Sequence, residues 1–85
     1  MSKLEDYAKG HGIDKRDVGR VILSASFTGE GPFELLSREE LIDTGIREGN
    51  SEAAVVGMVR EKIAALQKRN ASTDRYEQLL EWIGA

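Results

Sequence analysis

Apolar residues recur along this chain at intervals of three and four, which is the spacing of one face of an α-helix. Val18, Val21, Ile22 and Ala25 follow this spacing most clearly. The β-branched run at 20–23 would suit a strand, but a strand without a partner leaves its backbone hydrogen bonds unsatisfied. The pattern therefore predicts an all-α fold, a compact bundle of five or six short helices.

Serine, aspartate and glycine residues mark where the predicted helices begin and end. Ser2 and Ser37 each precede a glutamate by three residues, which is the spacing of a capping box. Asp14 is the expected cap of the second helix and either Ser51 or Asn50 that of the fourth, and glycine is the usual residue after a helix end. The predicted helices cover 2–9, 14–26, 37–48, 50–69 and 73–83. The segment 28–32 is the clearest break, because it contains two glycines and the only proline.

The residues on the repeated apolar faces are the predicted core. The residues expected to be largely buried are Val21, Ile22, Leu41, Ile46, Val59, Ile63, Leu66, Leu79 and Leu80. Ile42 is expected on the buried face of the third helix, and Leu23 and Phe27 are expected to extend the buried face of the second. Three other apolar side chains lie off the main stripes and are candidates for an exposed edge that joins two copies of the chain: Val55, Met58 and Trp82. For Trp82 the alternative is that it fills the core of so small a chain.

Length and composition exclude several classes of function. The 85 residues predict one helical domain, 1–85, with a net charge of −3 and no cysteine. Disulfides, thiolate metal sites and cysteine nucleophiles are therefore excluded. The single histidine, His11, cannot build a histidine metal site, and the serines lack the setting of a catalytic triad. We expect no enzymatic activity, no metal and no cofactor.

The chain also lacks the sequence signals of a membrane or secreted protein. No apolar run approaches the ~18–20 residues that cross a bilayer. Residues 1–5 lack the basic and apolar regions of a secretory signal. The sequence therefore predicts a cytoplasmic protein with no membrane partner.

Residues 4–21 contain a small residue, a turn glycine and a following apolar stripe. Ala8 lies four residues before Gly12, and Ile13, Val18 and Val21 follow. This spacing resembles the helix-turn-helix, in which a small residue permits the helix crossing and glycine accepts a left-handed turn. The resemblance covers about a quarter of the chain and implies a small DNA-binding regulator, with 1–28 as the helix-turn-helix part and 33–85 as the bundle and dimerisation part.

On this interpretation the helix at 14–26 enters the major groove of double-stranded DNA. Lys15, Arg16 and Arg20 would face the bases, since arginine pairs with guanine and lysine with bases or phosphate. Lys9 and His11 near the turn would contact the DNA backbone. Such small proteins usually pair to read two half-sites, so the sequence also predicts a homodimer.

The charge of the chain favours a second interpretation. Residues 1–28 hold five basic and four acidic side chains, whereas the remainder holds seven basic and eleven acidic ones. A DNA-binding domain usually has a clear basic excess. The number and length of the predicted helices are similar to those of death-fold and effector-associated interaction domains, which implies a protein-binding adaptor. A mixed or acidic surface around 14–26 would favour the adaptor, and a continuous positive surface would favour DNA.

Overall fold

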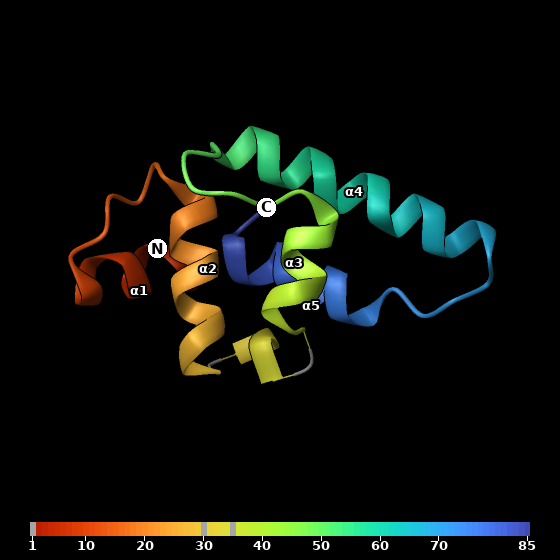
Figure 1. The fold of residues 1–85 in the computed structure, drawn as a ribbon, viewed down its shortest axis with the longest axis horizontal. Helices are drawn as coiled ribbons and strands as arrows, with labels where there is room; N and C mark the ends of the chain where they lie inside the picture. Colours follow the sequence, from red (N-terminus) through yellow and green to blue (C-terminus); the bar gives the residue numbers. More distant parts are fainter. Residues whose placement is uncertain (1, 30, 35) are drawn as a thin grey trace.

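The computed structural model describes residues 2–29, 31–34 and 36–85, and in these ranges all regular secondary structure is helical (Figure 1). The elements are α1 (Lys3–His11), α2 (Val18–Thr28), the 3-10 helix η1 (Gly31–Glu34), α3 (Arg38–Thr44), α4 (Glu52–Lys68) and α5 (Asp74–Ile83). No strand occurs in the described ranges. The predicted all-α bundle of short helices is therefore confirmed.

The helices pack around α2 and α5. α2 contacts α1, α3, α4 and η1, whereas α5 contacts α1, α4 and η1. The molecule measures 39 × 23 × 23 Å, and its long dimension follows α4, whose C-terminal end extends away from the other helices (Figure 1). The two ends of the chain lie together, because a Cβ placed on Gly84 would come within 2.8 Å of the Ser2 Cβ.

Three predicted serine caps are confirmed. The hydroxyl oxygens of Ser2, Ser37 and Ser51 accept hydrogen bonds from backbone N–H groups three residues later, at 3.1 to 3.2 Å. Each bond satisfies one of the N–H groups that a helix start leaves without a partner. The first helix ends later than predicted, at His11, and Gly12 follows it with a left-handed φ of 66°.

The predicted end of the third helix is wrong. α3 ends at Thr44, because Gly45 adopts a left-handed φ of 107° and its N–H donates back to the Ile42 carbonyl. The Ile46 N–H then donates to the Leu41 carbonyl at 3.1 Å, which turns the Ile46 side chain into the core. Gly49, where the helix was predicted to stop, lies in the following turn with a φ of 90°.

The predicted start of the second helix is also wrong. α2 begins at Val18, and its cap is Asp17 instead of Asp14. One carboxylate oxygen of Asp17 accepts from the Arg20 N–H at 3.1 Å and from the Gly49 N–H at 2.7 Å. Asp14 instead forms a local turn, in which its carboxylate accepts from the Arg16 N–H at 2.9 Å. The contact with Gly49, distant in sequence, favours the later start.

Most of the predicted core is confirmed. Val21, Ile22, Leu41, Ile46, Val59, Leu66 and Leu79 are buried. Ile63 of α4 and Leu80 of α5 are only partly buried, and they pack against the core. The expectation that Ile42 and Phe27 are buried is wrong, because their side chains are 48% and 76% exposed.

The expected exposed edge does not form. Val55 is fully buried, and Trp82 is 6% exposed. The Trp82 ring meets the Phe33 ring edge-on at 5.1 Å between centroids and lies 6.1 Å from the Tyr7 ring. The tryptophan therefore fills the core between α1, α5 and η1. Met58 is partly buried against the core, next to Gly45.

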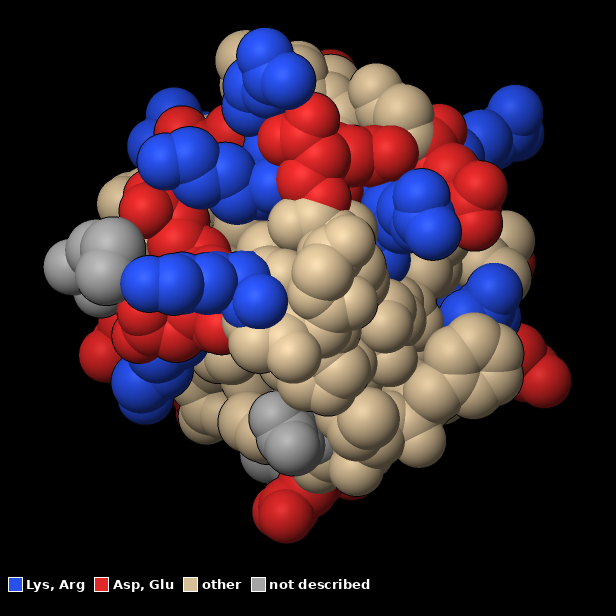
Figure 2. Space-filling view, turned by 90° about the vertical axis from the view of Figure 1, so that its left-hand side faces the viewer, with Lys and Arg blue, Asp and Glu red and all other residues tan. Residues whose placement is uncertain are grey.

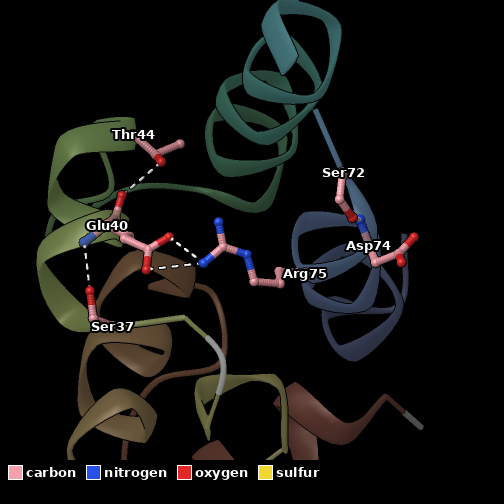
Figure 3. Close-up of polar contacts among 6 residues, drawn as sticks. All are labelled: Ser37, Glu40, Thr44, Ser72, Asp74 and Arg75. Carbon is pink, nitrogen blue, oxygen red and sulfur yellow. Dashed lines mark hydrogen bonds and ion pairs between the residues drawn. The ribbon is translucent and has the colours of Figure 1, made fainter. Parts of the chain in front are cut away.

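An ion pair joins α3 to the first turn of α5 (Figure 3). The Arg75 guanidinium lies 2.9 Å from one Glu40 carboxylate oxygen and 3.2 Å from the other. Glu40 also holds its own helix, because its N–H donates to Ser37 and its carbonyl accepts from the Thr44 hydroxyl at 2.8 Å. Both charged side chains remain more than a third exposed, so the pair adds only about 0–1 kcal/mol of stability.

Candidate protein-binding groove

The outer face of α2 borders an open groove. Arg20, Ser24 and Phe27 are spaced by four and three residues, so they share the face opposite the buried stripe. The groove has a volume of about 350 Å³, and its walls come from α1, α2, α3 and two loops. We call it the α2 groove, and it is lined by His11, Ile13, Arg20, Leu23, Ser24, Phe27, Arg38 and Glu48.

Arg38 is held in place at one side of the α2 groove. Its Nη1 donates to the Leu23 carbonyl oxygen at 3.1 Å. Its guanidinium carbon lies 4.2 Å from the centre of the Phe27 ring, which is a cation–π contact. Arg38 thus covers one face of the Phe27 ring, and Phe27 is nevertheless 76% exposed.

His11 forms another part of the wall and is equally well positioned. Its ring stacks on Tyr7 at 3.8 Å between centroids and 15° between planes. Its Nδ1 lies 2.9 Å from the Tyr7 carbonyl oxygen, which makes that nitrogen the donor of the bond. The Tyr7 hydroxyl in turn lies 3.2 Å from the Ser24 hydroxyl, so this contact ties α1 to the outer face of α2.

The charges of the α2 groove differ from those of the whole chain. Two arginines and one glutamate line it, whereas the chain has a net charge of −3. Neither Arg20 nor Arg38 forms an ion pair with any residue in the described ranges. The groove is therefore a cationic site in an acidic domain.

The other predicted DNA contacts lie elsewhere. Lys9 is exposed in the last turn of α1. Lys15 and Arg16 were predicted to lie on a helix, but they belong to the connection at 12–17 because α2 begins at Val18. Lys15 Nζ lies 3.9 Å from a Glu5 carboxylate oxygen. Of the five residues only His11 and Arg20 line the α2 groove, whereas Lys9 and Lys15 line a separate pocket with Glu5 and Ile13.

Arg16 is paired with the acidic residue of its own turn. Its Nη2 and Nε donate to the two Asp14 carboxylate oxygens at 3.0 and 3.2 Å. These hydrogen bonds hold the pKa of the Asp14 carboxyl below its ordinary value and raise the pKa of the Arg16 guanidinium. Figure 2 shows that Lys and Arg side chains interleave with Asp and Glu around a neutral area on the face that carries α1 and the 12–17 connection.

The first turn of α2 is covered by the loop between α3 and α4. The Gly19 N–H donates to the Asn50 carbonyl at 3.1 Å. A Cβ on Gly19 would overlap the carbonyl oxygen of Arg47, so the helix approaches this loop backbone to backbone. A recognition helix contacts base edges mainly with its N-terminal residues. In α2 this end is packed inside the protein on one side.

Sequence reasoning missed Phe27, Arg38 and Glu48 as members of the site. A helical wheel could have found Phe27, because it lies nine residues after Val18 and thus about 180° from it at 3.6 residues per turn. Arg38 and Glu48 carried no such signal. They reach the groove through the packing of α3 and the 45–50 loop against α2, which no local pattern describes.

Other features of the described chain point to no particular ligand or partner. A more open cavity of about 510 Å³ lies between the α1 residues Lys3 and Tyr7 and the Trp82 side chain. Among the residues placed by the structure, no three His, Asp or Glu side chains are arranged to hold a metal ion. None of the helices described is long and apolar enough to cross a bilayer.

No protein-family model matches the chain, and neither a curated protein nor a solved structure is similar to it.

Proposed function

We propose that the chain is a protein-binding module that holds its partner in the α2 groove. The observation that carries this proposal is the exposure of Phe27 beside an open groove, at 76%. A single exposed apolar residue needs no explanation. Phe27, however, lies beside a cavity and under a fixed arginine, and aromatic and arginine side chains are the residues that contribute most to binding at protein interfaces.

The ends of α2 support protein binding over DNA binding. Lys15 and Arg16 are paired with Glu5 and Asp14, so their charge is partly neutralised. The N-terminal turn of α2 is covered on one side by the 45–50 loop, while Arg20 in that turn stays exposed. Nonspecific DNA binding depends on many phosphate contacts, and the α2 groove offers only two arginines beside a glutamate. In this proposal the chain acts by binding, without catalysis.

The predicted homodimer stays a prediction. Of its three residues, Val55 and Trp82 are buried within one copy, and only Met58 retains partial exposure. Sedimentation of the purified chain tests it, and substitution Met58→Asp should reduce self-association if Met58 lies at the contact.

A selection experiment tests the proposed function. A library of short random peptides is selected on the wild-type chain and, in parallel, on Phe27→Ser. Wild-type binders should shift the amide resonances of Ser24 and Phe27 and should be lost with Phe27→Ser. The same chain is mixed with a pool of random duplex DNA at low salt. Retarded duplexes together with an absence of Phe27-dependent peptides would overturn the proposal and favour the DNA regulator.

A further inference from the structure

The charges of the α2 groove indicate the chemistry of its partner, and this inference rests on the proposed function. The guanidinium groups of Arg20 and Arg38 line it, with Glu48 as its one acidic side chain in the described ranges. The rest of the surface is acidic on balance, because the chain has a net charge of −3. Complementary charge selects partners and aligns them, so this site favours a partner segment that carries carboxylates.

Arg38 is already arranged to bind a carboxylate. Its bond to the Leu23 carbonyl uses one of the five N–H donors of the guanidinium. The Phe27 ring at 4.2 Å limits the motion of the group. A guanidinium held in this way loses little conformational freedom when it forms two parallel bonds to a carboxylate.

The apolar part of the groove lining favours a partner segment that also carries an apolar side chain. Ile13, Leu23 and Phe27 supply apolar surface to the groove. Its volume of about 350 Å³ is near the lower end of the ~300–1,000 Å³ range of ligand pockets. This space suits one anchoring side chain and its neighbours better than a whole helix face.

We propose that the α2 groove binds a short partner segment in which an aromatic or aliphatic residue is flanked by Asp or Glu. The apolar residue packs on the open face of Phe27 and against Leu23. One carboxylate accepts hydrogen bonds from Arg38, and another faces Arg20. Duplex DNA fits this site less well, because the apolar walls and Glu48 offer nothing to phosphate.

The test uses a library of short peptides whose central residue is Phe, Trp, Leu or Ile and whose flanking residues are drawn from Glu, Gln and Lys. Selection on the wild-type chain should enrich Glu and deplete Lys beside the anchor. In an enriched peptide, Glu→Gln should weaken binding about tenfold, since a hydrogen bond to a charged group is lost. Arg38→Gln should weaken binding similarly and should abolish the effect of Glu→Gln in the peptide.

Two further variants keep the test decisive. Arg20→Gln changes an exposed side chain of the groove, so it tests the charge requirement even if Arg38→Gln disturbs the fold. Arg69→Gln removes an exposed arginine at the end of α4. Arg69 does not line the groove, so this variant should leave binding unchanged. Circular dichroism of each variant checks that the helices are retained.

The possible failures have different meanings. Phe27-dependent peptides without a preference for Glu would overturn the acidic partner and leave the proposed function standing. An absence of Phe27-dependent peptides would overturn both. Duplex DNA that displaces the peptide and shifts the Arg38 and Phe27 resonances would identify DNA as the partner in place of the peptide. Shifts of these resonances with protein concentration alone would identify a second copy of the chain as the occupant.

Discussion

The two ends of α2 differ in how they meet the rest of the protein and the solvent. The first turn is tied into the protein by Asp17, which binds the Gly49 N–H, and by Gly19, which lies against the backbone of the 45–50 loop. The last turn presents Phe27 to solvent beside an open groove. One side of the first turn thus supports the fold, while the outer face of the same helix, from Arg20 to Phe27, is the candidate binding surface.

This difference argues against reading a helix-turn-helix from spacing alone. The packing part of the pattern is satisfied. Ala8, Val18 and Val21 are buried, and Gly12 has a left-handed φ. Those requirements belong to any two helices that cross after a tight turn. The part that reads DNA needs an accessible N-terminal turn, and packing decides that accessibility.

The largest expected effect tests the covered end. Gly19→Ala should destabilise the chain by about 3 kcal/mol, because the new Cβ overlaps the Arg47 carbonyl and the loop must move. Gly57→Ala in α4 is the matched control. Its Cβ would meet nothing within 4 Å, so it should stabilise the chain by about 0.5–1 kcal/mol. Urea unfolding measures both, and equal stability of the two variants would refute the close approach.

Asp17→Ala tests the cap at the same end. The free energy of unfolding should fall by about 2 kcal/mol, because the variant loses a helix cap and leaves the Gly49 N–H without its acceptor. Asp14→Ala removes an exposed turn residue and should change stability by less than about 0.5 kcal/mol. Were Asp14→Ala the more damaging of the two, the helix would begin at the position predicted from sequence.

Phe27→Ser tests the open end. Its effect on the free energy of unfolding should be below about 0.5 kcal/mol, since the exposed ring contributes little to the core. Thermal unfolding of the variant provides the measurement. A loss of several degrees in Tm would show that Phe27 supports the fold, and its exposure would then lose its value as a sign of binding.

The smallest effect concerns the 12–17 connection. Arg16 lowers the folded-state pKa of Asp14, so the pair stabilises the turn above the ordinary carboxyl pKa of 3.8, and this is lost as pH falls through the lowered value. In Arg16→Gln the pKa of Asp14 should rise toward 3.8. A carboxyl-detected NMR titration of both proteins measures it, and an unchanged pKa would contradict the pairing.

Local signals in the sequence determined the helical fold, the caps at Ser2, Ser37 and Ser51, and most of the core. Helical spacing and capping depend on residues within one or two turns of each other, so they can be read from a short stretch of chain. The same signals placed Arg20 on an outer helix face and His11 next to the turn, and both residues line the α2 groove.

Tertiary structure decided where α2 begins, where Trp82 lies and which residues form the groove. The start of α2 depends on a bond between Asp17 and Gly49, and Arg38 reaches the groove by binding the Leu23 carbonyl across fifteen residues. Trp82 fills a space made jointly by Phe33 and Tyr7. Each outcome depends on segments that meet only after folding, and no periodicity or cap within one segment can specify such a contact.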